Sequence, residues 1–118
     1  MKQHLLTFNI NNIIAEEAAV PEERILSGAP VTRTWNVEET SDGKLFAGIW
    51  EATPGAWRVS YDEWEFCEIE SGHSRVTEDG GETVELRPGD RLVLRPGFTG
   101  VWEVVETTRK SYVIRLPG

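Results

Sequence analysis

A carboxylate and a thiol lie two residues apart in an aromatic run of the sequence. Glu65 and Cys67 belong to residues 56–70, AWRVSYDEWEFCEIE. In a β-strand, alternate side chains point to the same face. Glu65 and Cys67 then share a face that is apolar at both ends, with Trp57, Val59, Tyr61, Glu63 and Ile69. We predict that this face is the inner one and that Glu65 is paired or bound there, because an unpaired carboxylate among apolar groups is costly.

Two interpretations of this carboxylate remain open. As a functional group, Glu65 beside Cys67 could hold a proton or bind a ligand amine. As a structural group, it would pair with an interior base, for which Lys110, at the start of the run KSYVIRL, is the candidate. A lysine facing Glu65 across a barrel forms a buried ion pair that can orient a charged ligand. A lysine facing outward would be an ordinary surface residue.

Nucleophilic catalysis is not predicted. A catalytic cysteine needs an adjacent base, and the only histidines are His4 and His73. His73 follows a turn expected at Ser71-Gly72, so we expect it to be exposed. No Ser-His-Asp arrangement, phosphate-binding loop or zinc motif is present.

The charge and cysteine content exclude several classes of partner. The formal net charge is −8, whereas nucleic acids and anionic membranes are bound by basic patches. No run approaches the roughly 18 apolar residues of a membrane span, and the start MKQHLLTFNI is too short and polar for a signal core. A single cysteine permits no intrachain disulfide, so we expect a protein of the reducing cytoplasm.

Short strands separated by turns dominate the second part of the chain. From Lys44 onward, runs rich in valine, isoleucine and aromatic residues are broken every 8–12 residues or so, which is typical of a sandwich or barrel. The breaks are Pro54-Gly55, Ser71-Gly72, Asp79-Gly80-Gly81, Pro88-Gly89-Asp90 and Pro96-Gly97.

The first 43 residues have a different texture. They predict a strand over 5–10, at most one short helix over 15–23, weakened by Pro21, and a polar loop ending at Gly43. We therefore expect one domain, in which N-terminal strands and an arm (1–43) pack on a barrel core (44–118). Alternation also turns Trp64 and Phe66 outward, which predicts a second sheet or a subunit interface at that face.

The turn and strand motifs together resemble the cupin family. EFCEIESG resembles the end of the first cupin half-motif, and GDRLVLRPG resembles the second. With WEATPGAWRV, PGFTGVWEV and RKSYVI, the resemblance covers residues 44–115 and is narrowest to small cupins similar to the ethanolamine-utilisation and ureidoglycine aminohydrolase cupins. It implies an all-β fold, a double-stranded β-helix or jelly-roll-like barrel of two antiparallel sheets, and a homodimer.

The sequence departs from this family at the metal site. In metal-binding cupins a His-x-His precedes the motif glutamate, here Glu65, and a further histidine follows later. The His-x-His positions hold Val59 and Tyr61, or Arg58 and Ser60 if the spacing is one residue longer. The position of the later histidine holds Gly100. Because a divalent metal needs about three or four converging N, O or S donors, we expect no metal and no other cofactor.

The candidate pocket residues are aromatic, acidic and basic. Aromatic rings at strand positions either stack on flat or cationic ligands or fill the core; Tyr61 is expected to plug the former metal position. RKSYVI matches an Arg-Lys-x-Tyr pattern of the resembled subgroup. The predicted ligand-binding set is Trp50, Trp57, Tyr61, Glu65, Cys67, Trp102 and Lys110.

Three functions are compatible with these residues. The first is a metal-free, small-molecule-binding cupin, accessory to nitrogen or amine catabolism as the resemblance implies. The second is an enzyme, an isomerase or aminohydrolase-like lyase acting on a small nitrogenous or carboxylated substrate, with Glu65 or Lys110 transferring a proton. The third is a structural or regulatory subunit without a ligand.

Overall fold

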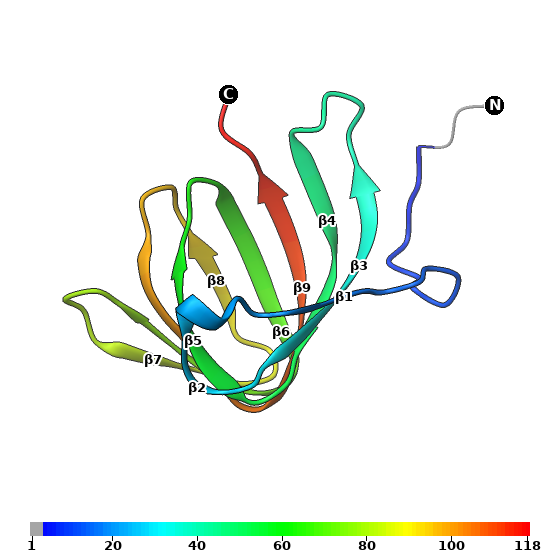
Figure 1. Cartoon of the computed structure of the whole chain (residues 1–118). Helices are drawn as coiled ribbons and strands as arrows, with labels where there is room; N and C mark the ends of the chain where they lie inside the picture. Colours follow the sequence, from blue (N-terminus) through cyan, green and yellow to red (C-terminus); the bar gives the residue numbers. More distant parts are fainter. Residues whose placement is uncertain (1–3) are drawn as a thin grey trace.

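The protein is almost entirely β-structure. A computed structural model describes residues 4–118 and shows a sheet that curls into a half-barrel (Figure 1). The only helical element within this range is a single 3₁₀ turn, Glu22–Arg24. The strands are β1 (Glu16–Ala19), β2 (Ile25–Gly28), β3 (Val31–Glu39), β4 (Leu45–Ala52), β5 (Gly55–Ser60), β6 (Trp64–Glu78), β7 (Thr83–Leu86), β8 (Arg91–Leu94) and β9 (Thr99–Arg115).

Two long strands, β6 and β9, pair with each other along their whole length and run through both halves of the half-barrel. The first half-sheet has the order β1-β3-β4-β9-β6-β8 and contains residues 64–69 of β6 and 108–115 of β9. The second half-sheet has the order β2-β5-β9-β6-β7 and contains residues 73–78 of β6 and 99–104 of β9. The all-β prediction and the antiparallel pairing are therefore confirmed.

The prediction of a turn at Ser71-Gly72 is wrong. The strand continues through this point, and its pairing with β9 shifts register between residues 69 and 74. Gly72 has a φ of +88°, and a Cβ there would lie 2.0 Å from the carbonyl oxygen of Thr107. Glycine is thus required because the strand bulges against β9, which bends it without ending it. The runs VWEVVE and KSYVIRL likewise belong to one strand, β9.

The other predicted glycine turns are confirmed, because each stands where one strand ends and the next begins, with Gly55 the first residue of β5. The run 56–70 is not a single strand, however. It divides at residues 61–63 into β5 and β6. There the backbone N–H of Tyr61 donates to the carbonyl oxygen of Phe98 and the N–H of Gly97 donates to the carbonyl oxygen of Tyr61, which links the two connecting loops.

The N-terminal predictions are wrong in two places. Residues 5–10 form no strand, and the described residues before β1 run as an exposed arm. Residues 16–19 form an edge strand paired with β3, so the short helix predicted over 15–23 is wrong, and Pro21 precedes the 3₁₀ turn. In the described part of the chain, no helix is long and apolar enough to cross a membrane.

Alternation along β6 sorts its side chains as predicted. Glu65, Cys67 and Ile69 are buried on the concave side, whereas Trp64 is 36% exposed on the convex side. The core between the half-sheets also contains Trp57, Trp102, Leu86 and Leu94. The concave side therefore combines an apolar core with a buried carboxylate.

Candidate functional site

A pocket of about 560 Å³ opens on the concave side of the sheet. Both half-sheets contribute to its wall, with β3, β4, β6 and β9 on one side and β5 on the other. Its aromatic and charged lining residues are Glu16, Arg24, Glu39, Phe46, Trp50, Trp57, Tyr61, Glu63, Glu65, Trp102, Lys110 and Tyr112.

An ion pair forms the floor of the pocket. The Nζ of Lys110 lies 3.1 Å from Oε2 of Glu65, and each side chain is 4% exposed. Lys110 faces inward because its β9 register places it opposite Trp50 of β4 and Ile69 of β6, both on the concave side. The structural interpretation of Glu65, an interior base as its partner, is thus the arrangement observed.

Two tryptophans enclose the ammonium group of this pair. The Nζ of Lys110 is 4.4 Å from the ring centroids of both Trp50 and Trp102. The two rings meet edge to face, with centroids 5.7 Å apart. Because the negative face of an aromatic ring attracts a cation, and most strongly where water is excluded, this cage offsets part of the cost of burying Lys110.

The acidic groups around Lys110 hold it in the charged form. Burial by itself lowers the pKa of a lysine, but the Glu65 carboxylate 3.1 Å away, together with Cys67 and Tyr61, which ionise only at alkaline pH, more than offsets this, so the pKa of Lys110 is raised above its ordinary value. The floor therefore contains a permanent ammonium group at neutral pH.

The hydroxyl and thiol beside the pair stay protonated. Burial raises the pKa of the Tyr61 hydroxyl well above its usual value and raises the pKa of the Cys67 thiol to about 12. Cys67 is also fully buried. A buried thiol that holds its proton is a poor nucleophile, which agrees with the expectation that Cys67 is not catalytic.

A buried hydroxyl network supports the tryptophan wall from behind. The indole Nε1 of Trp102 donates to Oγ of Ser74 at 3.3 Å. Ser74 and Thr108 share a hydrogen bond of 2.7 Å, and Thr108 donates to the carbonyl oxygen of Glu106. Ser74 and Thr108 lie beside the register shifts in the β6–β9 pairing, and their hydrogen bonds hold the ring of Trp102 in place.

The rim of the pocket is acidic, and the sequence did not predict it. Glu16, Glu39 and Glu63 line the opening together with Arg24. Glu16 and Glu39 reach the rim because β1 pairs with β3 and β3 pairs with β4. Both residues are far from Glu65 in the sequence, and only the strand pairing brings their charges to the same opening.

Six of the seven predicted pocket residues line this pocket, and Cys67 lies buried next to them. Trp57 and Trp102 are 6% and 1% exposed, so they mainly fill the core. Trp50 is half-buried and shows more of its ring to the opening. The structure thus brings the predicted set together at one place in the barrel.

The residues at the family's metal position do not fit a metal ion. A Cβ at Gly100 would lie 2.1 Å from the carbonyl oxygen of Thr77, so no histidine side chain can stand there. Val59 and Tyr61 supply no metal-binding nitrogen, and the ammonium of Lys110 occupies the space beside Glu65. Within residues 4–118, no three His, Cys, Asp or Glu side chains are grouped so that they could hold a metal.

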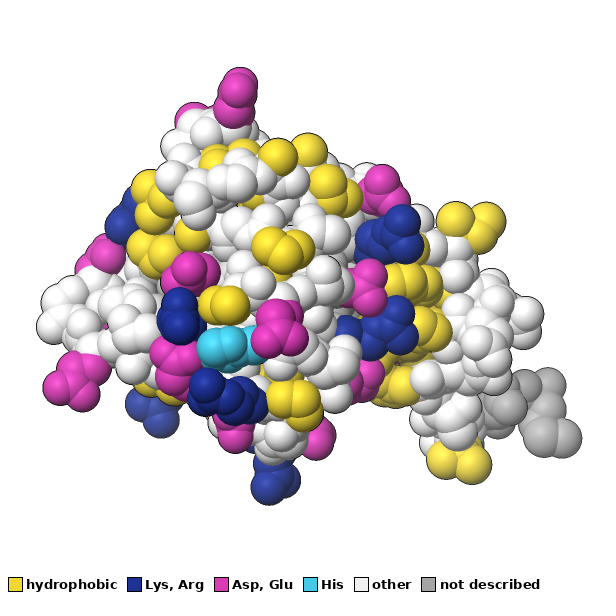
Figure 2. Space-filling model, turned by 90° about the horizontal axis from the view of Figure 1, so that it is seen from below, with side chains coloured by type: hydrophobic (Ala, Val, Ile, Leu, Met, Phe, Trp, Pro, Cys, Tyr) yellow, Lys and Arg dark blue, Asp and Glu magenta, His cyan; other side chains and the backbone are white. Residues whose placement is uncertain are grey.

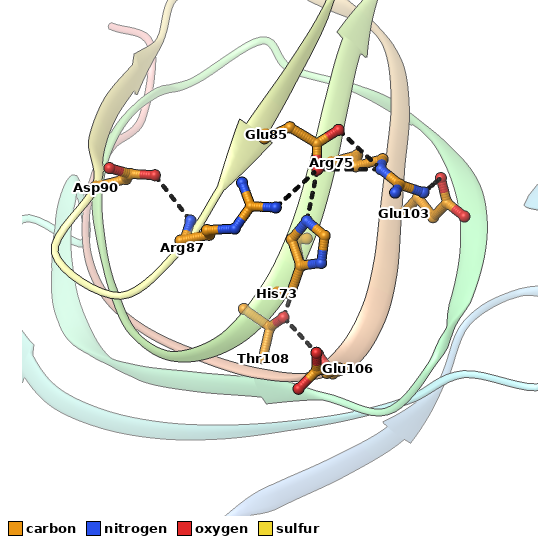
Figure 3. Close-up of polar contacts among 9 residues, drawn as sticks. His73, Arg75, Glu85, Arg87, Asp90, Glu103, Glu106 and Thr108 are labelled. Carbon is orange, nitrogen blue, oxygen red and sulfur yellow. Dashed lines mark hydrogen bonds and ion pairs between the residues drawn. The ribbon is translucent and has the colours of Figure 1, made fainter.

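His73 lies outside this pocket, on the convex side of the second half-sheet. Its ring nitrogen Nε2 is 2.5 Å from Oε1 of Glu85, and its side chain is 14% exposed. The expectation that it is exposed is wrong, because residues 71–73 belong to the bulged strand. Figure 3 shows His73, Arg75 and Glu85 in a ladder of ion pairs that continues to Glu103. Figure 2 shows acidic and basic side chains intermixed on this side of the molecule.

The family follows from the match of residues 39–112 to the model of the EutQ-like cupin domain. The chain belongs to the EutQ-like cupins. The matched segment contains both half-motifs and the Glu65–Lys110 pair, so the predicted cupin resemblance is confirmed. No curated protein matches the sequence.

Solved structures share the fold at low sequence identity. A protein of unknown function from Pseudomonas syringae is 19% identical with a TM-score of 0.78, over 87% of this chain and 45% of that one. The Clostridium difficile EutQ protein is 19% identical with a TM-score of 0.64, over 73% and 63%. Ectoine synthase from P. lautus is 16% identical with a TM-score of 0.72, over 97% and 80%. This cupin thus spans less than half of the Pseudomonas protein, and these likenesses concern the fold alone.

Proposed function

We propose that this cupin binds a small organic cation, a molecule with an amine, in the concave pocket. The observation that carries the proposal is the charge of the lining, in which four carboxylates face two cations. Three of the carboxylates stand at the rim, where an entering ligand meets them first. An acidic opening above aromatic rings attracts and holds ammonium groups.

The Glu65–Lys110 pair at the pocket floor, the floor pair, leaves few free lysine donors for an anionic ligand. A lysine ammonium has three donors; here Glu65 accepts on one side, and the rings of Trp50 and Trp102 flank the group. Rim carboxylates such as Glu63, by contrast, have exposed or half-buried side chains. A ligand amine therefore finds acceptors, whereas a ligand carboxylate finds a lysine already engaged and acidic groups around it.

A role accessory to nitrogen or amine catabolism is consistent with this chemistry. The resemblance to ethanolamine-utilisation cupins implies an amine ligand, and the charge of the pocket lining supports an amine ligand on physical grounds alone. A volume of about 560 Å³ suits a small metabolite.

The test is calorimetric titration with matched pairs of small ligands. Ethylamine and ethanolamine, both protonated at pH 7.5, are compared with acetate and glycolate. We expect saturable binding of an amine and none of the carboxylates. Glu63→Gln should weaken amine binding several-fold, whereas the control Glu82→Gln, in the loop between β6 and β7, should leave it unchanged. Binding confined to the carboxylates, or equal effects of both variants, would overturn the proposal.

An enzyme is the second candidate, and one observation favours it. The Tyr61 hydroxyl lines the same pocket as the Glu65–Lys110 pair, so a proton donor, an acceptor and a fixed cation belong to one site. Such a set can move a proton on a bound substrate, as an isomerase or lyase requires. Release of product from a bound amine, followed by proton NMR and lost in Tyr61→Phe, would favour the enzyme. A pocket that binds none of the ligands would leave a structural or regulatory subunit.

A further inference from the structure

Strand β3 brings uncharged polar side chains to the concave pocket. Thr32, Thr34 and Asn36 stand at alternate positions of β3 and therefore point to the same side. All three line the pocket. Binding of an amine uses the carboxylates and the aromatic rings, and it leaves these hydroxyl and amide groups without a role. They can form directional hydrogen bonds with uncharged polar groups of a ligand.

A hydrogen bond that crosses β4 fixes the carboxamide of Asn36. The Tyr112 hydroxyl on β9 donates to Oδ1 of Asn36 at 2.8 Å. The bond passes β4 at Gly48, where a Cβ would lie 2.8 Å from this hydroxyl and 2.1 Å from the carbonyl oxygen of Trp35. Glycine therefore keeps the path between β9 and β3 open. Because Oδ1 faces Tyr112, the Nδ2 group of Asn36 is turned away from it.

The Nδ2 group of Asn36 keeps its hydrogens for a ligand. Among the hydrogen bonds of residues 4–118, none is donated by this group, and the side chain is exposed at the pocket. An amide NH₂ donates and does not accept, so it selects a ligand oxygen that accepts. Thr34 adds a hydroxyl of the same kind, whereas the hydroxyl of Thr32 already donates to the carbonyl oxygen of Ala18.

The strand register brings these donors close to a rim carboxylate. Thr34 lies opposite Glu16 of β1 on one side and opposite Trp50 of β4 on the other. Side chains directly opposite each other are about 5 Å apart, and diagonal neighbours such as Glu16 and Asn36 are about 7–8 Å apart. A group that holds an ammonium ion and groups that hold a hydroxyl therefore lie within reach of a single small molecule.

Strand β4 adds apolar surface beside these groups. Phe46 and Trp50 both line the pocket on either side of Gly48, and both are half-buried. We call these two rings the β4 wall. The carbon skeleton of a ligand held by Glu16 and Asn36 meets the β4 wall, which favours a compact apolar body such as a six-membered ring.

We propose that Asn36, together with Thr34, forms a hydroxyl-binding subsite, and that the ligand is an amine that also carries a hydroxyl group on a ring-sized carbon skeleton. This inference rests on the proposed function, because the amine is the group that the carboxylates hold. The amine binds at Glu16, the hydroxyl accepts from Asn36, and the skeleton lies against the β4 wall. Asn36 contacts the ligand, and Tyr112 is a positioning residue.

The test is calorimetric titration of the full chain with three ligands that share one skeleton. trans-4-Aminocyclohexanol carries both groups at opposite ends of its ring, cyclohexylamine carries only the amine, and cyclohexanol carries only the hydroxyl. We expect aminocyclohexanol to bind roughly three- to tenfold more tightly than cyclohexylamine, which is the factor that one or two neutral hydrogen bonds supply. Cyclohexanol should show no measurable binding.

The ligand series separates this inference from the proposed function. Cyclohexylamine that binds as tightly as aminocyclohexanol would overturn the hydroxyl subsite and leave amine binding intact. Cyclohexanol that binds as tightly as aminocyclohexanol, or a pocket that binds neither amine, would overturn amine binding and the subsite with it.

Substitutions assign the preference to particular residues. Asn36→Ala should abolish the preference for aminocyclohexanol and leave cyclohexylamine binding within about twofold of the wild type. Tyr112→Phe keeps the ring but frees the carboxamide to turn, so it should reduce the same preference without changing cyclohexylamine binding. The matched control, Asn12→Ala in the exposed arm, should retain the full preference.

Cyclohexylamine also serves as the internal control for folding of each variant. A preference that survives Asn36→Ala would overturn the subsite. Equal losses of affinity for both amines in Asn36→Ala would show a structural role and would overturn the subsite as well. Tyr112→Phe with an unchanged preference would overturn the positioning role of Tyr112.

Discussion

The ion pair at the pocket floor and the ladder of ion pairs around Glu85 differ mainly in their contact with water. The Glu65–Lys110 pair lies at the pocket floor with each side chain 4% exposed. The Arg75–Glu85 pair, on the convex side of the second half-sheet, has side chains about ten times more exposed, at 40% and 39%. Figure 3 shows how the second set shares its charges among several partners.

The comparison teaches that burial, more than distance, decides what a pair does. The Arg75 Nε to Glu85 Oε2 distance of 2.8 Å is even shorter than the 3.1 Å of the buried pair. Water and salt screen the exposed charges, so their attraction contributes little. A buried charge that loses its partner stays out of contact with water, so breaking the pair is costly. The pair therefore holds both side chains in the observed arrangement. The floor pair should therefore specify the pocket, whereas the outer ladder should tolerate change.

Removing the buried cation should produce the largest effect. Lys110→Met keeps the length of the side chain but leaves the Glu65 carboxylate uncompensated in the core. We expect a loss of roughly 3–5 kcal/mol in the free energy of unfolding, measured by urea denaturation. Lys44→Met, which changes an exposed lysine hydrogen-bonded to the Pro117 carbonyl oxygen, is the matched control and should have little effect. A similar small loss in both variants would contradict the role of the floor pair.

A double-mutant cycle should show strong coupling. Glu65→Gln removes the charge that Lys110 needs, and Lys110→Met removes the charge that Glu65 needs. Because the combined variant leaves no unpaired charge, its loss of stability should be smaller than the sum of the two single losses. The same denaturation experiment measures all four proteins. Additive losses would mean that the two residues stabilise the fold independently.

Alkaline pH should weaken the buried region before the ladder is affected. Burial raises the pKa of Cys67 from the ordinary 9.0 to about 12. The folded state therefore holds a proton that the unfolded chain releases, so this contribution to stability is full below pH 9 and is lost as the pH rises toward 12. The raised pKa values of Lys110, Tyr61 and Tyr112 act in the same direction.

Cys67→Ala tests this contribution. The variant should lose less stability than the wild type between pH 9 and pH 11, although it starts lower at pH 7 because a cavity replaces the thiol. Thermal unfolding followed across this pH range gives the comparison. Parallel curves for the two proteins would show that the thiol does not titrate on unfolding.

The smallest effect is expected at the outer ladder. Arg75→Gln removes a guanidinium that contacts both Glu85 and Glu103. Because these groups are in water, the melting temperature should change only slightly, and the difference should shrink further in 0.5 M salt. His73 can retain its contact with Glu85 in this variant. A loss as large as that of Lys110→Met would erase the distinction between the two regions.

Local rules predicted much of this site. Alternation along one run was enough to place Glu65 and Cys67 inward and Trp64 outward, because the pleat of a strand is set by its own backbone. Alternation did not predict that the run divides at residues 61–63, because Tyr61 faces the pocket even though it lies in the break. The glycine turns were recognisable because they stand between apolar runs, except at Gly72, where the same residue type serves a bulge.

The sequence by itself determined the all-β class, the inward carboxylate and the absence of histidines from the family's metal positions, because these depend on residue type and on neighbours along the chain. Only the tertiary structure decided that Lys110 meets Glu65, that Trp50 and Trp102 enclose its ammonium, and that Glu16 and Glu39 reach the rim. Those contacts depend on the register between distant strands. That register is set by bulges in β6 and by core packing over the whole sheet, which no local pattern encodes.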